Sequence, residues 1–243
     1  MNMLFTALPL SYFSEISQKF YEALILKGRY KYILEGLSNT LTITVFAVII
    51  GVILGTIVAL IKTAHDSNPQ KLRVLNALCH VYLTVIRGTP IVVQLMIMWY
   101  IVLNSANVDK LVAAILAFGI NSGAYVAEVI RSGLQSVDKG QIEAGRSLGL
   151  SQRDTMIKIV FPQALKNVLP AIGNEFISLL KETSVAGYIA IQDLTKAGDT
   201  IMSMTYDPYT PLFVVAGIYL VIVMGLTALL RKFERRLRRS DYR

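Results

Sequence analysis

The sequence predicts an all-α integral membrane protein with five transmembrane helices, with the N-terminus outside the cell and the C-terminus in the cytoplasm. Three observations predict this fold class. Apolar residues make up 54% of the chain and charged residues only 16%, against roughly 25% charged in a typical soluble domain. Long segments carry no formal charge, and the Lys and Arg residues gather in alternate connecting segments.

The five spans follow from the charge-free segments. Asp, Glu, Lys and Arg are absent from residues 36–61, 88–108, 111–127 and 208–230. A fifth apolar segment, 167–191, carries only Glu175, Lys181 and Glu182. About 20 helical residues cross a hydrocarbon core of ~30 Å. We therefore expect helices, which satisfy their own backbone in lipid, near 38–61, 83–103, 109–130, 168–190 and 209–230.

The orientation follows from the distribution of Lys and Arg. Residues 62–73, 131–166 and 231–243 hold 16 of the 24 basic residues. The intervening loops, 104–110 and 191–208, hold one each. Because basic residues gather on the cytoplasmic side, the loop 131–166 and the C-terminus are predicted to be cytoplasmic.

Three parts are predicted along the chain: an extracytoplasmic N-terminal segment (1–36), a five-span domain (37–230) and a basic cytoplasmic tail (231–243). In the first part, apolar residues recur at helical spacing, at Phe13, Ile16, Phe20 and Leu24. This amphipathic helix either lies at the outer membrane interface or packs on the bundle. The tail is expected to meet anionic lipid headgroups rather than nucleic acid.

Composition argues against several other classes. The one cysteine, Cys79, excludes an intrachain disulfide. His65 and His80 stand apart from other plausible ligands, so no metal site is expected. The chain has no G-x-x-x-x-G-K-[ST] loop to hold phosphates. It also has no Ser-His-Asp or Cys-His arrangement suited to catalysis, so we expect a non-enzyme with no catalytic residues.

The cytoplasmic loop is predicted to contain two short helices joined at a glycine. Residues 141–148 are good helix formers apart from Gly145, and Gly149 can adopt the left-handed conformation that ends a helix. Ser151 can cap a second helix, with Asp154 three residues on. Pro162 is expected to end or kink that helix. The pair forms either a stiff docking element or a hairpin that only covers the bundle.

Polar residues inside the predicted spans lie at helical spacing, which places them on single helix faces. The third span has Asn121, Tyr125 and Glu128, and the fourth has Glu175, Ser178 and Glu182, with Lys181 beside them. Charges within a bilayer are costly and need a partner or a function.

These residues admit two interpretations. As a substrate path, Glu175 would hold an ammonium group, while Asn121, Tyr125 or free backbone N–H groups would hold a carboxylate. As structure, Lys181 would pair with Glu182 or Glu128. We favour the substrate role for Glu175 and the structural role for Glu128.

The second span contains Arg87-Gly88-Thr89-Pro90. Pro90 disfavours helical geometry at Thr89, and Gly88 adds backbone freedom. This is a broken helix that borders a transport site, or a hinge or cytoplasmic entry turn. The second interpretation is favoured, and it places Arg87 at the inner headgroups.

The cytoplasmic loop resembles the signature of permease subunits in ATP-binding-cassette (ABC) importers, Glu-Ala-Ala-x3-Gly-x9-Ile-x-Leu-Pro. The matching positions are Glu143, Ala144, Gly145, Gly149, Ile159, Phe161 and Pro162. Gly145 replaces the second Ala and Phe161 replaces Leu. The segments ILEGLSNTLTITV, IRGTPIVVQL, SGAYVAEVIRSGLQSVDKGQIEA and NEFISLLKETSV resemble the polar amino acid branch of that family.

The resemblance implies a type I ABC importer permease in the bacterial cytoplasmic membrane. It implies a second permease subunit, identical or related, two ATPase subunits that hold ATP and Mg, and an extracytoplasmic amino-acid-binding protein. The loop residues Glu143 to Gly149 would then dock on an ATPase, and the amino acid would cross between inward-turned spans. Two other classes remain open: an ion-coupled secondary carrier that uses Glu175 and Glu182, and a passive membrane anchor.

Overall fold

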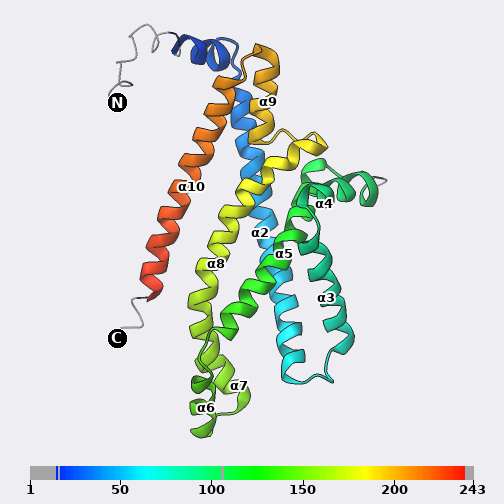
Figure 1. The fold of residues 1–243 in the computed structure, drawn as a ribbon, viewed down its shortest axis with the longest axis vertical. Helices are drawn as coiled ribbons and strands as arrows, with labels where there is room; N and C mark the ends of the chain where they lie inside the picture. Colours follow the sequence, from blue (N-terminus) through cyan, green and yellow to red (C-terminus); the bar gives the residue numbers. More distant parts are fainter. Residues whose placement is uncertain (1–14, 16, 105–106, 239–243) are drawn as a thin grey trace, which may run out of the picture.

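The computed structural model describes residues 15, 17–104 and 107–238, and every regular element within those ranges is helical. In chain order these are η1 (Tyr21–Ile25), α2 (Tyr30–Ser67), α3 (Arg73–Gly88), α4 (Ile91–Ile97), η2 (Met98–Val102), α5 (Lys110–Gln135), α6 (Lys139–Ser147), α7 (Gln152–Thr155), η3 (Met156–Val160), α8 (Phe161–Glu182), η4 (Thr183–Ile189), α9 (Leu194–Thr205) and α10 (Tyr209–Arg238). The predicted all-α class is confirmed. Figure 1 shows α2, α5 and α10 running in one direction and α3 and α8 in the other.

Three helices in the described ranges are long and apolar enough to cross a membrane: α2, α5 and α10. They contain or closely match the predicted spans 38–61, 109–130 and 209–230. A fourth candidate is the bent pair formed by α3 and residues 91–102. Helix α8 is not among the candidates, because polar residues such as Lys166, Asn167 and Asn174 interrupt its apolar sequence.

The core lies between α2 and α5, which pack closely along their lengths. Glycines make the close approach possible: a Cβ on Gly51 would lie 2.7 Å from Ser122 Oγ, and one on Gly55 would lie 2.7 Å from Val126 Cβ. Ile43, Leu95 and Phe118 are fully buried beside this crossing. Small residues let helix backbones approach where lipid supplies no hydrophobic drive between helices.

The second span differs from its predicted bounds of 83–103. Helix α3 begins ten residues earlier, at Arg73, and the chain bends by 111° between Gly88 and Ile91. Thr89 is extended (φ −123°, ψ 147°) because Pro90 follows it. The chain is thus broken at Gly88 to Pro90, and Arg87 lies 3.7 Å from the Glu128 carboxylate and 6.0 Å from the centre of the Tyr125 ring, both on α5.

The fourth span also differs from its predicted bounds of 168–190. Helix α8 begins at Phe161 and ends at Glu182, and residues 183–189 form a 3-10 turn (η4) that leaves the helix axis. Pro162 does not end the second loop helix, which continues into α8. A π-helical turn, η3, precedes it, in which the Phe161 N–H bonds the Met156 carbonyl. A wider turn accommodates the missing N–H of proline.

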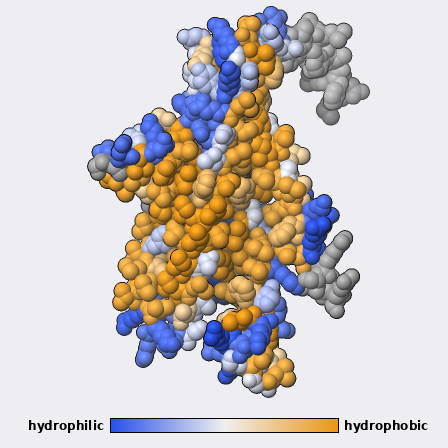
Figure 2. Space-filling view, turned by 180° about the vertical axis from the view of Figure 1, so that it is seen from behind, coloured by the Kyte–Doolittle hydropathy of each residue, from blue (hydrophilic) through white to orange (hydrophobic). Residues whose placement is uncertain are grey.

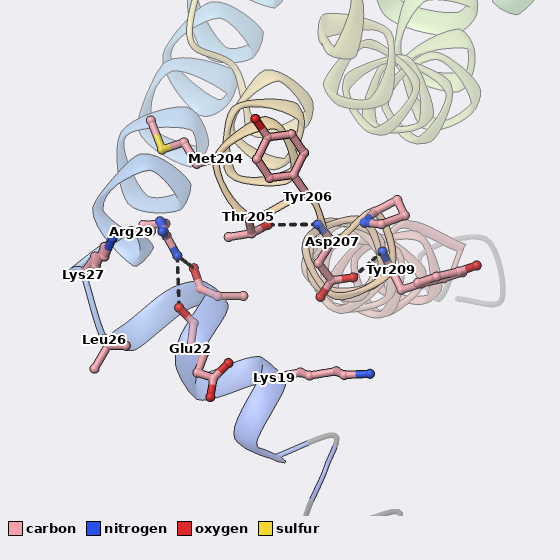
Figure 3. A pocket seen from close by; sticks show the side chains of 12 residues that line it. Lys19, Glu22, Leu26, Lys27, Arg29, Met204, Thr205, Tyr206, Asp207 and Tyr209 are labelled. Atoms are coloured by element: carbon pink, nitrogen blue, oxygen red, sulfur yellow. Dashed lines mark hydrogen bonds between the residues drawn. The ribbon is translucent and has the colours of Figure 1, made fainter.

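The N-terminal helix packs on the end of the bundle formed by α9 and the start of α10. Ala23 and Leu24 are buried against α9 and α10, whereas Phe20 is exposed. Phe13 and Ile16 of the predicted stripe lie outside the described residues. The Arg29 guanidinium donates to the carbonyls of Glu22 (3.0 Å) and Ala23, and the α9–α10 turn at Asp207 faces this segment across a cavity (Figure 3).

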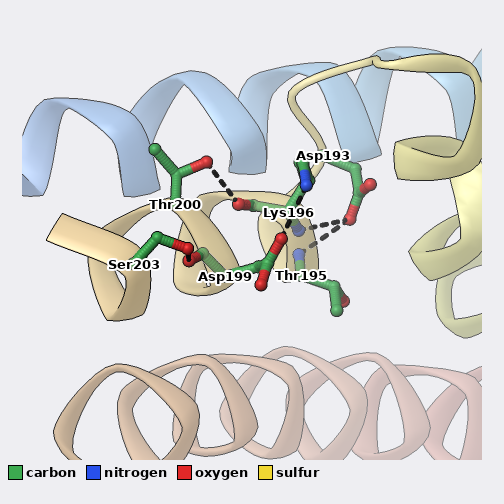
Figure 4. Close-up of polar contacts among 6 residues, drawn as sticks. All are labelled: Asp193, Thr195, Lys196, Asp199, Thr200 and Ser203. Atoms are coloured by element: carbon green, nitrogen blue, oxygen red, sulfur yellow. Dashed lines mark hydrogen bonds and ion pairs between the residues drawn. The ribbon is translucent and has the colours of Figure 1, made fainter. Parts of the chain in front are cut away.

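A buried carboxylate caps the N-terminus of helix α9. Asp193 caps it, with Oδ1 accepting from the N–H groups of Thr195 (2.7 Å) and Lys196 (3.2 Å) (Figure 4). On the same helix the Lys196 ammonium pairs with Asp199 at 2.6 Å. Burial raises the pKa of the Asp193 carboxyl, and hydrogen bonds from backbone N–H groups oppose that shift.

The surface carries a broad hydrophobic band with polar groups gathered at both ends (Figure 2). Exposed apolar residues of α2 and α10, such as Ile53, Leu60, Val221 and Met224, belong to this surface. The basic residues 231–238 continue α10 as helix, and residues 239–243 of the predicted tail lie outside the described ranges. Such a band indicates a protein that is covered by lipid or other subunits.

Candidate coupling loop and transport path

The predicted pair of short helices is present in the loop 131–166. Helix α6 begins after Asp138, whose carboxylate accepts from the Gly140 N–H at 2.6 Å. It ends at Ser147, and Gly149, two residues further on, has φ +83°. There the Gly149 N–H bonds the Arg146 carbonyl, and the Leu150 N–H bonds the Gly145 carbonyl. These two bonds form a Schellman motif, the helix ending that the glycine predicts.

The second helix begins at the predicted cap. The Ser151 hydroxyl oxygen accepts from the Asp154 N–H at 3.0 Å and its O–H donates to the Asp154 carboxylate at 2.6 Å. The hydrogen bond from Ser151, together with Lys158, lowers the pKa of Asp154. Residues 152–182 then run as one uninterrupted helical path through η3 into α8. The loop is thus rigidly continuous with a long helix of the bundle.

Gly145 lies at the contact between the two loop helices. It is buried, and a Cβ there would lie 2.9 Å from both Thr155 Cγ2 and Ile159 Cδ1. Gly145, which stands where the signature has its second Ala, therefore lies at the point where α6 comes close to the second helix. Val137 and Val160 form a small core beneath this contact.

The outward surface of the loop is formed by α6. Glu143 and Ala144 are exposed, and Leu148 is 83% exposed. Pro162 is also exposed, whereas Ile159 is partly buried against Gly145. Among the signature residues, Glu143, Ala144 and Pro162 are thus exposed, whereas Gly145 and Ile159 pack against each other between the two helices.

Replacing Ser151 with Ala is expected to loosen this loop without unfolding the bundle. Loss of an N-cap costs about 1 kcal/mol, which corresponds to roughly fivefold faster local opening. Hydrogen exchange of the amides in residues 144–160 measures this change, and the pKa of Asp154 should rise as its hydrogen bond is lost. Ser151→Asp, which keeps a capping oxygen, is the control. Equal exchange rates in the Ala and Asp variants would contradict the role of the cap.

Some of the polar residues predicted to form a path contact a neighbouring helix, and others lie partly buried along α8. Glu175 on α8 faces α5, where its carboxylate accepts from the Ser122 hydroxyl at 3.1 Å. Asn121 is buried and donates to Gln94 Oε1 on α4 at 3.0 Å. Ser178 and Glu182 are partly buried further along α8.

Glu128 lies in a network of charges that the sequence did not indicate. It lies 3.7 Å from Arg87 of α3 and 3.7 Å from Arg131 of its own helix, and Arg131 lies 3.9 Å from Asp66 of α2. Lys181, predicted to pair with Glu182 or Glu128, is exposed and forms no ion pair in the described ranges. The cation that pairs with Glu128 from another helix is thus Arg87 and not the predicted Lys181.

The helix break at Gly88 and Pro90 is stabilised by Gln94. Its side-chain amide donates to the carbonyls of Ile86 (2.7 Å) and Thr89 (3.0 Å), which the end of α3 leaves without helical partners. Its Oε1 accepts from Asn121, so the break is joined to the middle of α5. The role of Gln94 depends on its contacts with the end of α3 and with Asn121, which the spacing of residues along one helix does not indicate.

A cavity of about 400 Å³ lies between the end of α3, α5 and α8. Its lining includes Arg87, Tyr125, Glu128, Ser132, Ser136 and Asn167. The two histidines line a different cavity, between α2 and α3. Within the described ranges, no three His, Cys, Asp or Glu side chains converge.

Comparisons with known proteins match this architecture. A model of the family described as "Binding-protein-dependent transport system inner membrane component" matches residues 51–239. The arginine transport system permease protein ArtQ of Bacillus subtilis (strain 168) is 39% identical over 86% of this chain and 94% of its own length. The glutamine transport system permease protein GlnP of Escherichia coli (strain K12) is 35% identical over 85% of this chain and 93% of its own.

Solved structures agree with the sequence relatives. One, described as an amino acid ABC transporter with histidines, matches with a TM-score of 0.79 and 38% identity, over 97% of this chain and 100% of that one. The MetNI methionine ABC transporter, at 20% identity and a TM-score of 0.70, shares the fold. The chain therefore belongs to the family of binding-protein-dependent transport system inner membrane components: it is a permease subunit of an ABC transporter, a transport subunit whose ATP is hydrolysed on a partner chain.

Proposed function

We propose that this permease imports polar amino acids, with basic amino acids as candidates, by alternating access across the bacterial cytoplasmic membrane. The named relatives carry arginine and glutamine, which are both polar. The serine and asparagine side chains in the cavity between α3, α5 and α8 suit such substrates. Glu175 supplies a carboxylate for the ammonium group that all of them share.

The proposed topology has five spans, with α8 as the fourth. Helices α2, α5 and α10 run one way and α3 and α8 the other (Figure 1). The N-terminus then lies outside, and the loop 131–166 and the C-terminus lie in the cytoplasm, in agreement with the distribution of Lys and Arg. Glu175 and Asn167 of α8 contact Ser122 of α5 and Ser136 at the end of α5, and such polar contacts make a less apolar span acceptable.

The observation that carries the proposed mechanism is the rigid continuity of the α6–α7 pair with α8. Glu143, Ala144 and Gly149 form the docking side, and Gly145, Ile159 and Pro162 support it. Two ATPase subunits, which hold ATP and Mg, would close and move these elements as rigid bodies. A second permease subunit, a copy or a relative of this one, would complete the path, and a binding protein would deliver the amino acid.

Replacing Glu175 with Gln is expected to reduce transport about tenfold or more, because a charged hydrogen bond to an ammonium contributes roughly 1.5–3 kcal/mol. The kcat and KM of ATP-dependent uptake by proteoliposomes measure the effect. Glu35→Gln, an exposed carboxylate at the start of α2, is the matched control. Unchanged affinity and rate in Glu175→Gln would remove Glu175 from the substrate path.

The transport class is tested by uptake of a labelled amino acid panel into proteoliposomes that contain the co-purified complex. Uptake that requires ATP and the binding protein supports the proposal. Uptake driven by an ion gradient without any ATPase would instead identify a secondary carrier that uses Glu175 and Glu182. An associated ATPase that never responds to substrate would indicate a passive anchor.

A further inference from the structure

Helix α10 runs along the side of the bundle and leaves one of its faces uncovered by the described chain (Figure 1). Only 6% of its most apolar part is buried, against 39% for α2 and 61% for α5. The other face has partners: Val215 is buried against α9, and a Cβ on Gly173 of α8 would clash with Leu230. The uncovered face therefore lies on the side of α10 away from α8 and α9.

An apolar stripe runs along the uncovered face. Leu220, Val221 and Met224 are 60%, 70% and 62% exposed, and Ala228 continues the exposed line. At about 100° of rotation per residue, Val221, Met224 and Ala228 lie on the side of the helix opposite Leu230. The stripe and the contact with α8 thus occupy opposite sides of α10.

Four cations extend the same face beyond the end of the apolar run. They are exposed and, together with Ala228, they line a cavity of about 590 Å³: Arg231, Lys232, Arg235 and Arg236. Within the described ranges their side chains form no ion pair or hydrogen bond. We call these four residues the basic quartet.

The helix itself does not account for the basic quartet. Like charges at i, i+4, such as Arg231 and Arg235, repel each other. The helix dipole favours cations only in the last turn, and Arg231 and Lys232 precede the last turn of a helix that ends at Arg238. The positive-inside rule selects a side of the membrane, but it does not gather cations on one helix face. An anionic group from outside the chain is therefore needed to balance them.

We propose that the basic quartet binds the phosphate of one anionic phospholipid, whose acyl chain lies along the stripe formed by Leu220, Val221 and Met224. A phospholipid has its parts in this order, with an apolar chain toward the bilayer centre and a charged phosphate at the surface. Arg presents paired donors that match phosphate oxygens. The proposal requires that α10 crosses the membrane, which its length and composition allow, and it goes beyond the import of amino acids.

A lipid bound there would also stabilise the contact between α10 and α8. Leu230, which meets α8 at Gly173, directly precedes Arg231. Neutralising the basic quartet removes the repulsion that opposes helix formation next to this contact. Helix α8 continues without interruption from the second loop helix. The lipid would therefore support the helix to which the coupling loop is attached.

The test is photolabelling of the co-purified permease–ATPase complex in nanodiscs of phosphatidylcholine. The probe is phosphatidylglycerol with a photoreactive group in its acyl chain, and mass spectrometry identifies the labelled peptides. We expect labelling within residues 220–228. Unlabelled phosphatidylglycerol should displace the probe about tenfold or more better than added phosphatidylcholine does, because each nearby Lys or Arg attracts an anionic lipid by roughly a factor of five. Inorganic phosphate should not displace the probe.

Two double variants separate this site from a general attraction of positive charge. In Arg231→Gln/Arg235→Gln the preference for phosphatidylglycerol should fall by about tenfold or more. In Lys71→Gln/Arg73→Gln, which removes two positive charges from the connection between α2 and α3, the preference should remain.

Two further variants keep the site testable if the first does not assemble. Lys232→Gln/Arg236→Gln removes the other two cations and should show the same loss of preference. Ala228→Trp keeps all four cations but fills the cavity that Ala228 lines, so it should also reduce the labelling of residues 220–228.

Three results would overturn the lipid site. An absence of labelling at residues 220–228 in the assembled wild-type complex would mean that another subunit covers this face. Displacement of the probe by inorganic phosphate would mean that the quartet binds a free anion. An equal loss of preference in the two double variants, one at the quartet and one at the α2–α3 connection, would mean that surface charge alone attracts the lipid. None of these results bears on the import of amino acids, which uptake measures separately.

Discussion

Replacing Gly149 with Asp is expected to leave the complex assembled while lowering ATP-driven uptake by about tenfold or more. The position has φ +83°, and a Cβ there meets no atom within 4 Å. Asp tolerates the left-handed conformation better than most residues, so the fold should lose only about 1 kcal/mol. The loss of function arises elsewhere. A carboxylate at the tip of the loop would be buried unpaired against the ATPase, which costs several kcal/mol.

Two variants separate the charge from the backbone conformation. Gly149→Asn has the same shape without the charge and should retain more uptake than Gly149→Asp. Gly28→Asp introduces the same residue at another glycine of positive φ (+65°), also in open space but outside the loop 131–166. It should transport normally. Uptake and ATP hydrolysis by proteoliposomes are measured together, and normal ATP-driven uptake by Gly149→Asp would contradict the coupling role of the loop.

The coupling loop was predictable because its determinants are local. A glycine that stops a helix, a serine that caps the next and an aspartate three residues later specify the turn without reference to the rest of the chain. The contact at Gly145 was not predictable. It depends on how close α6 approaches Ile159, which the three-dimensional packing determines.

The positions of the spans were predictable where a long charge-free run marks them. They were less predictable for α3 and α8, which contain charged residues along their length. Helices α2, α5 and α10 each contain nearly all of one charge-free run, and they extend past its ends into charged residues. Helix α3 begins ten residues before the predicted second span because residues 73–88, which include Arg73 and Arg87, are helical ahead of the charge-free run that located the span. In the structure Arg87 lies beside Glu128 and Tyr125 of another helix. A partner on another element cannot be read from spacing along one helix.

The contacts of the candidate substrate residues were not predictable from the sequence. Glu175 was singled out by its position in an apolar span, but its contact with Ser122 joins residues 53 positions apart. Arg87 and Gln94 were not assigned to a transport path from the sequence, although both lie where the broken helix meets α5. Long-range pairing of this kind is set by helix packing, and spacing within one helix does not report it.

The largest loss of stability is expected from Gly55→Val, at the crossing of α2 and α5. A Cβ at Gly55 would lie 2.7 Å from Val126 Cβ and 2.8 Å from the Ala127 nitrogen. The second of these is backbone and the first is the root of a stiff side chain, so neither can turn away and the helices must separate. Overpacking of this kind costs about 3 kcal/mol, and loosening the crossing also exposes the contacts around Ile43 and Phe118.

Gly217→Val is the matched control, because Gly217 lies in α10 with no atom within 4 Å of a Cβ. It makes the same chemical change in a membrane-crossing helix, and its effect should stay within about 0.5 kcal/mol. Thermal unfolding of the detergent-solubilised complex compares the two variants with the wild type. If Gly55→Val and Gly217→Val had the same midpoint, the close approach of α2 and α5 would not be what holds the bundle. Val126→Ala removes Cγ1, which would also lie 2.7 Å from a Cβ at Gly55, but it keeps the Cβ at position 126 and the Ala127 backbone. It should therefore restore the Gly55→Val midpoint only in part.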